Sequence, residues 1–103
     1  MKEKRGVSFE ELLAKQLKNK EVRLLFDEKL FYLQVAHLVT ELREKSGLSQ
    51  AEVAKRAHVS QPLIARLEKG DHRRAPTFDM LYRILKVLGY SLMIAVKPER
   101  KAA

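Results

Sequence analysis

Four residues near the middle of the chain combine hydrogen-bonding groups, a cation and apolar surface at a spacing that places them on one helix face. They are Gln61, Pro62, Ala65 and Arg66, and residues three to four positions apart share a face of an α-helix. Amide and guanidinium groups can read base edges in the major groove of DNA, which admits a helix, and a proline ring can touch a thymine methyl group. This face therefore predicts hydrogen bonds and apolar contacts to base edges.

Two short helices joined by a tight turn are predicted to carry this face. They span residues 48–70, and Ser49 and Ser60 supply the hydroxyl N-caps at which each helix begins. Ala54 is small at a point where two crossing helices must approach closely. The segment is therefore predicted to be a helix-turn-helix whose second helix presents a polar outer face. The apolar contacts that fix the crossing angle come from Val53, Val59, Ile64 and Leu67.

The charge of the chain is strongly positive and is concentrated on the same segment. Lys and Arg number 21 against 13 acidic residues, which gives a net charge of +8, and residues 43–74 carry +4 of it. Such an excess favours a polyanionic partner, either nucleic acid or an anionic membrane. The alternative is that the surface cations only keep the protein soluble. Their position on the helix-turn-helix favours nucleic acid.

Catalysis, metal binding and a cofactor find no support in the sequence. There is no cysteine, the three histidines are scattered, and no glycine-rich phosphate-binding loop is present. Ser60 is explained as an N-cap rather than as a nucleophile. No apolar run is long enough to span a bilayer. We therefore expect a cytoplasmic protein that is not an enzyme.

The remaining elements are predicted to be mostly helical. Ser8 and Glu11 form a capping box that begins an amphipathic helix. A long helix follows over residues 21–46 and ends at Gly47, and a last helix is expected over residues 77–88. The short apolar run that follows, with its β-branched residues, predicts a strand. The predicted organisation is a helical extension at residues 1–27, a domain at 28–90, and a strand with a basic tail at 91–103.

The predicted strand and the N-terminal helix each leave more than one interpretation open. A single strand cannot satisfy its own backbone groups. It could pair with a second copy or with a partner protein's sheet, or it could be an extended tail lying on the core. The N-terminal helix could bind a protein partner, because Glu10 and Glu11 oppose an anionic membrane surface, or it could simply add to the core.

The helix-turn-helix segment resembles the DNA-reading segment of the phage lambda and 434 repressors and of the wider Xre family. The fold implied is an all-α, five-helix, lambda-repressor-like domain. Where this family has glycine in the turn, the chain has His58, which tolerates a left-handed backbone better than most residues. The resemblance also implies an ion pair between Arg43 and Glu68. The residues that carry the resemblance are Gln50, Ala54, Val59, Ile64 and the end of the segment at residues 67–70.

The same resemblance implies roles for individual residues in binding DNA. The residue matching Gln50 holds a phosphate, those matching Gln61, Pro62 and Arg66 face bases, and the loop after the second helix meets the DNA backbone. The predicted DNA-binding residues are Gln50, Ser60, Gln61, Pro62, Ala65, Arg66, Lys69, His72, Arg73 and Arg74.

Over nearly its whole length the chain is similar to HigA-type antitoxins. The similarity rests on residues 8–22, the long helix, the DNA-reading core and the final apolar segment. It implies a repressor of its own operon that also neutralises a RelE-like ribonuclease toxin. A homodimer is expected, since two reading helices match a two-fold operator, with residues 78–88 and 92–96 as its seam. The alternatives are a stand-alone Xre-type regulator and a helical protein-interaction module.

Overall fold

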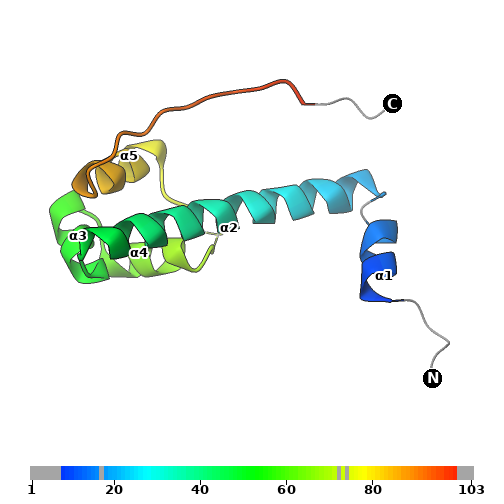
Figure 1. The fold of residues 1–103 in the computed structure, drawn as a ribbon, viewed down its shortest axis with the longest axis horizontal. Coiled ribbons are helices and arrows are strands. Elements are labelled where there is room, and N and C mark those ends of the chain that lie inside the picture. The colour runs from blue at the N-terminus through cyan, green and yellow to red at the C-terminus, as the bar shows by residue number, and fades with distance from the viewer. Residues whose placement is uncertain (1–7, 17, 72, 74, 100–103) are drawn as a thin grey trace.

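A computed structural model describes residues 8–16, 18–71, 73 and 75–99 of the chain and shows an all-helical fold over them (Figure 1). The five helices in this part include the N-terminal extension, so α2 to α5 make up the helix-turn-helix domain. The all-helical expectation is confirmed. The helices are α1 (Phe9–Gln16), α2 (Lys20–Ser46), α3 (Gln50–Ala57), α4 (Gln61–Glu68) and α5 (Phe78–Val87).

The ends of the first two helices follow from side chains that satisfy free backbone groups. The backbone N–H of Ser8 donates to the Glu11 carboxylate, and the N–H of Glu11 donates to the Ser8 hydroxyl, both at 3.1 Å, which forms the predicted capping box. Asn19 separates α1 from α2, and its Oδ1 accepts the N–H of Glu21 at 2.8 Å. Gly47 ends α2 in a left-handed conformation, with φ of 75°.

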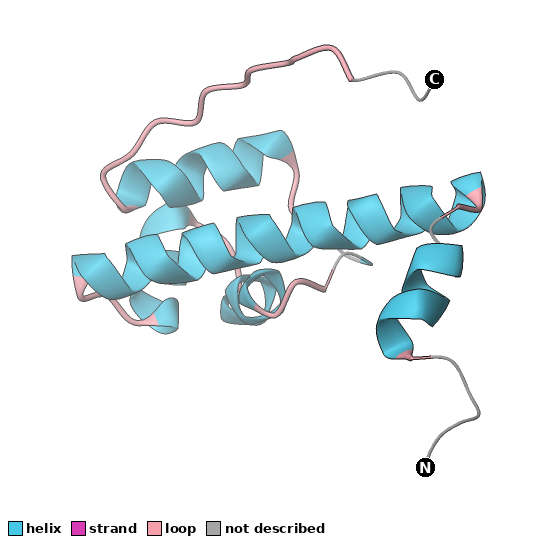
Figure 2. Cartoon of the chain, turned by 45° about the vertical axis from the view of Figure 1, so that its right-hand side comes forward, coloured by secondary structure: helices cyan, strands magenta, loops and turns pink. Residues whose placement is uncertain are grey.

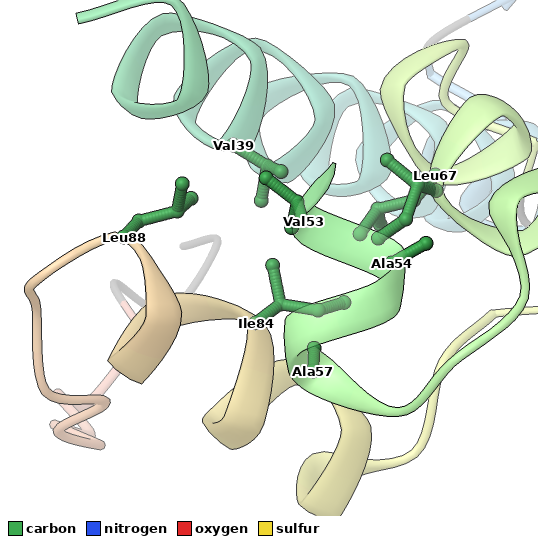
Figure 3. Packing of buried hydrophobic residues seen from close by; sticks show 8 residues of the cluster. Val39, Val53, Ala54, Ala57, Leu67, Ile84 and Leu88 are labelled. Atoms are coloured by element: carbon green, nitrogen blue, oxygen red, sulfur yellow. The ribbon is translucent and has the colours of Figure 1, made fainter. Parts of the chain in front are cut away.

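The core lies where the C-terminal half of α2 meets α3, α4 and α5 (Figure 3). Ile64 and Ile84 are completely buried, and each such side chain contributes about 1.5–3 kcal/mol relative to an exposed one. Ala54 and Ala57 are small, which allows α3 to pack closely between its neighbours. The core cluster consists of Val39, Val53, Ala54, Ala57, Ile64, Leu67, Ile84 and Leu88.

The N-terminal half of α2 extends away from this core and leads back to α1 (Figures 1 and 2). The radius of gyration is 18.1 Å, compared with about 13 Å for a compact domain of this length. The predicted boundary between residues 27 and 28 falls inside α2, which is continuous there. No helix in the described residues is long and apolar enough to cross a membrane.

The predicted C-terminal strand is absent, and this prediction was wrong for the single chain. Residues 91–99 are extended without strand pairing. The N–H of Tyr90 donates to the carbonyl of Leu85 at 2.8 Å, and no backbone hydrogen bond joins residues 91–99 to the rest of the described chain. The physical reason is that an apolar, β-branched sequence forms a strand only against a partner edge. The described helices offer no such edge.

Candidate nucleic-acid interface

The turn between α3 and α4 is built on a non-glycine residue in a left-handed conformation. His58 has φ of 59° and ψ of 43°, and its N–H donates to the carbonyls of Ala54 and Lys55. The N–H of Val59 then donates to the carbonyl of Ala54 at 3.0 Å. These bonds close α3 and turn the chain directly into α4, as predicted for this substitution of glycine.

The first turn of α4 presents its polar residues to solvent. The Ser60 hydroxyl caps the helix by accepting the N–H of Leu63 at 3.2 Å. Gln61 and Pro62 follow and are both exposed. Proline is accommodated in the first helical turn because its missing N–H would have no partner there. The start of α4 is therefore a rigid, open surface that carries an amide and an apolar ring.

The two faces of α4 differ sharply in burial. Ile64 and Leu67 are buried in the core, whereas Ala65 and Arg66 are half-buried beside the exposed first turn. The Nε atom of Arg66 is buried and has no hydrogen-bond partner among the described residues. The guanidinium group is therefore packed against the protein for part of its surface, which restricts the directions from which a ligand can reach it.

The loop after α4 begins with a backbone arrangement that fixes its direction. Gly70 is left-handed, with φ of 76°, and the N–H of Asp71 donates to the carbonyl of Arg66 at 3.1 Å. Lys69, at the end of α4, is exposed. Arg73 is also exposed, so two of the four loop residues predicted to contact the DNA backbone are accessible. The predictions for His72 and Arg74 lie outside the described residues.

An acidic residue, Asp71, lies within this basic loop and was missed by the sequence analysis. Its Oδ1 accepts both the N–H and the Nε–H of Arg73 at 3.1 Å, and its Oδ2 accepts from Nη2 at 3.2 Å. The hydrogen bonds from Arg73, together with the charge of Arg66, lower the pKa of Asp71. The sequence signal for Asp71 is a single acidic residue between the predicted cations Lys69 and Arg73. Asp71 holds Arg73 in place and offsets part of the positive charge.

Glu68 joins the beginning of the motif to its end. Its Oε2 accepts the Nε–H of Arg43 at 2.6 Å, and its Oε1 accepts Nη2 of Arg43 at 3.0 Å and the amide of Gln50 at 3.1 Å. Burial alone would raise the pKa of Glu68, but the hydrogen bonds from Arg43 and Gln50 outweigh it and lower the pKa. The hydrogen bond to Glu68 raises the pKa of Arg43. The predicted ion pair is confirmed.

The structure thus brings the predicted residues of three segments to neighbouring positions. Gln50, the first residue of α3, lies beside the end of α4 because its amide reaches Glu68. Ser60, Gln61 and Pro62 begin α4, and Lys69 ends it. Because the Glu68 network fixes Gln50, a half-buried residue, its position relative to α4 is set before any ligand arrives. The described residues contain no group of acidic or histidine side chains placed to hold a metal ion.

The fold and the arrangement of α3 and α4 define a helix-turn-helix protein, and the chain belongs to the helix-turn-helix family of the Xre type. The family model matches residues 39–93, from the C-terminal half of α2 into the extended C-terminal segment. This is a family of DNA-binding regulators rather than of enzymes.

Two relatives extend the comparison. An uncharacterized HTH-type transcriptional regulator, y4dJ, of Sinorhizobium fredii is 42% identical over 57 residues, which are 55% of this chain and 71% of the relative. A solved toxin-antitoxin module from Streptococcus pneumoniae has 29% sequence identity and a TM-score of 0.54. That match covers 90% of this chain and 97% of the other, so it includes much more than the helix-turn-helix.

Proposed function

We propose that the protein is a sequence-specific transcriptional repressor that reads operator DNA with the outer face of α4. The observation that carries this proposal is the contrast between the two faces of the helix. Ile64 is buried, whereas Gln61 and Pro62 are exposed on a capped, rigid first turn. An α-helix held in this way fits the major groove, where amide groups read base edges.

Distinct parts of the interface have distinct roles in this proposal. Gln61, Pro62, Ala65 and Arg66 face the bases. Phosphates are contacted by Gln50, Ser60, Lys69 and Arg73. His72 and Arg74 lie outside the described residues, and their phosphate contacts are proposed from the sequence alone. The Ser60 hydroxyl accepts from Leu63 and keeps its own proton for a phosphate oxygen. Two copies of the chain would place two α4 helices on a two-fold operator.

DNA binding can be tested with the fragment upstream of the gene and a scrambled fragment of equal length. We expect tighter binding to the natural fragment and a steep loss of affinity with salt. Arg66→Ala should reduce discrimination between the two fragments by about 1–3 kcal/mol. Lys69→Ala is the matched control, because it should weaken both fragments alike. Equal affinity of the wild-type protein for both fragments would overturn the proposal.

We further propose that the protein is the antitoxin of a type II toxin-antitoxin module. In this role it represses its own operon in the cytoplasm and neutralises a RelE-like ribonuclease toxin. The similarity to a toxin-antitoxin module over 90% of this chain supports the proposal, because it includes elements that DNA reading does not need. The N-terminal half of α2 also exposes large apolar side chains that a protein partner could cover, among them Leu24, Leu25, Phe26 and Leu30.

The antitoxin role is tested separately by co-expression with the product of the adjacent gene. We expect a stable complex and relief of any growth arrest that the adjacent product causes alone. Leu24→Asp combined with Leu25→Asp should abolish the complex while leaving operator binding unchanged, because these residues are distant from α4 in sequence and exposed. An adjacent product that neither binds nor inhibits growth would overturn this role and leave the repressor proposal intact.

A further inference from the structure

The loop after α4, which we call the basic loop (residues 69–74), passes close to α2 at Gly70. A Cβ atom added to Gly70 would lie 2.8 Å from Cδ2 of Leu33 and 3.7 Å from the Cα of Leu33. Real Cβ atoms essentially never approach another heavy atom within 3.0 Å, so a larger residue here would push the Leu33 side chain aside. The Leu33 side chain therefore packs directly against the start of the basic loop.

The core accounts for little of the position of Leu33. Its side chain is 54% exposed, and it lies outside the core cluster that α2 shares with α3, α4 and α5. Substitution of an exposed side chain usually changes stability little. The contact with Gly70 is thus made by a residue that the core does not require.

The turn that ends α4 lacks the apolar contact that often accompanies such a turn. The N–H of Asp71, which follows the left-handed Gly70, donates to the carbonyl of Arg66 at 3.1 Å, as in the Schellman motif. In this motif the residue after the glycine frequently packs an apolar side chain on the last helical turn. Here that residue is Asp71, whose carboxylate binds Arg73 instead. Leu33 therefore supplies from α2 an apolar contact that the loop itself lacks.

We infer that Leu33 is a positioning residue for DNA binding. By packing against Gly70, it sets the direction in which the basic loop leaves α4 and so holds Lys69 and Arg73 where they reach phosphates. Leu33 does not contact DNA itself and acts through Gly70. The inference rests on the proposed function, because Lys69 and Arg73 are phosphate contacts in that proposal.

Gly70 is the joint at which such an effect is expected. Glycine has the widest conformational freedom of any residue, so its backbone angles need support from outside the loop. Lys69 directly precedes this joint. Arg73 is tied to Asp71 by three hydrogen bonds and moves with the start of the loop. A small change of backbone angle at Gly70 would therefore displace both cations.

The dependence of DNA affinity on salt tests the inference with the full-length chain and the upstream and scrambled fragments. Each phosphate contact contributes about 0.9 to the slope of log affinity against log salt concentration, which is about eightfold in affinity at 0.1 M salt. Leu33→Ala should lower the slope by about one contact on both fragments. The ratio of the two affinities should stay as in the wild type, because the base-facing residues of α4 are not moved.

Two matched variants separate positioning from a general loss of apolar surface. Leu30→Ala removes a leucine that is 44% exposed one turn earlier on α2, and it should keep the wild-type slope. Leu33→Met keeps an apolar side chain of similar volume and should recover most of the slope. All three variants should keep the wild-type helical circular dichroism. A wild-type slope in Leu33→Ala, or an equal change in Leu30→Ala, would overturn the inference.

Substitution of the glycine tests the same contact from the other side. Gly70→Ala adds a methyl group against Leu33 and should weaken DNA binding. Gly47→Ala is the control for backbone strain alone, because Gly47 has nearly the same φ of 75° and no atom within 4 Å of its added methyl group. It should leave the salt slope unchanged.

The double variant of Leu33→Ala with Gly70→Ala shows whether the two residues act together. Residues in contact have coupled effects, so the double variant should lose less affinity than the product of the two single losses, by at least about twofold. Independent effects, in which the two losses multiply, would overturn the inference.

The inference and the proposed repressor can fail separately. Phosphate contacts form on any sequence, so the slope of Leu33→Ala can be measured on scrambled DNA even if the wild-type chain shows no preference for the natural fragment. That result would remove the repressor and keep the inference. If the wild-type chain prefers the natural fragment and Leu33→Ala keeps its slope, the inference fails and the repressor stands. A wild-type chain that binds neither fragment would overturn both.

Discussion

Two regions of the molecule differ in construction. The inward-facing region consists of the C-terminal half of α2 with α3, α4 and α5. The outward-facing region consists of α1, the N-terminal half of α2 and the extended segment at residues 91–97. In the first region apolar side chains face inward, as Ile64 and Ile84 show, and Glu68 ties separate segments together. In the second region Leu24, Phe26 and Val96 face solvent. Exposed apolar surface of this extent marks sites where other macromolecules bind.

This difference separates a region with a complete core from a region whose apolar side chains are left uncovered. The inward-facing region is complete without a partner, so it can present α4 rigidly and lose little conformational entropy when DNA binds. The outward-facing region has no comparable core of its own. Its exposed apolar side chains are consistent with the proposed protein partner on α2.

Core truncation should give the largest effect and the clearest contrast between the regions. Ile64→Ala removes a completely buried side chain and should lower the free energy of unfolding by about 2–5 kcal/mol. Leu24→Ala, at a site 70% exposed, should change it by less than about 0.5 kcal/mol. Urea denaturation followed by circular dichroism measures both. Comparable losses would show that the outward-facing region is also part of the folded core.

Removal of Arg43 should be the next largest effect. The Glu68 side chain is only 6% exposed, so Arg43→Ala leaves a largely buried carboxylate with the Gln50 amide as its main partner. We expect a loss of about 3 kcal/mol in unfolding free energy. Arg43→Lys should recover only part of the lost unfolding free energy. It restores the positive charge, but an ammonium group cannot form the two-point contact of the guanidinium. Discrimination between operator variants should change little at temperatures where the protein is folded, and a large change would contradict a structural role.

Acid should weaken the inward-facing region through Glu68. Because the folded-state pKa of Glu68 lies below its ordinary value of 4.5, its contribution to stability is present above that value and is lost as pH falls through the folded pKa. Unfolding free energy should therefore decline as the pH drops below 4.5. The comparison with Glu68→Gln isolates this residue, since that variant should lose less on acidification. An identical pH profile in the two proteins would refute the assignment.

The smallest effect is expected at the loop, where Asp71 offsets the cations around it. Asp71→Asn removes a negative charge beside Arg73 and should tighten binding to scrambled DNA by about threefold. The ratio of affinities for natural and scrambled fragments should fall. Asp79→Asn is the control, since Asp79 lies on α5 and pairs with Arg83. Equal effects of the two substitutions would show that net charge alone is responsible.

The sequence predicted the inward-facing region well because its signals are local. Ser49, Ser60 and Thr77 each cap a helix that begins at the next residue, and Gly47 ends α2. Hydroxyl and glycine caps depend on a few neighbouring residues, so they can be read without tertiary information. The Arg43–Glu68 pair came instead from the family resemblance, which substitutes for long-range information.

Features that depend on long-range contacts could not be predicted in the same way. The apolar, β-branched run from Leu92 to Val96 indicates a strand, but whether it becomes one depends on a partner edge. The hydrogen bond from Gln50 to Glu68 spans 18 residues and has no periodic signal. The contact of Asp71 with Arg73 depends on the conformation of the loop, which also has no periodic signal in the sequence.

Hydrogen exchange of the full-length chain, with and without the natural upstream DNA fragment, tests the central claim most directly. Our account predicts that DNA protects amides in residues 58–71, around the start and end of α4, and leaves residues 20–30 of α2 unchanged. The scrambled fragment at equal concentration should protect them less. Protection confined to the N-terminal half of α2, with α4 exchanging as in the free protein, would contradict the account.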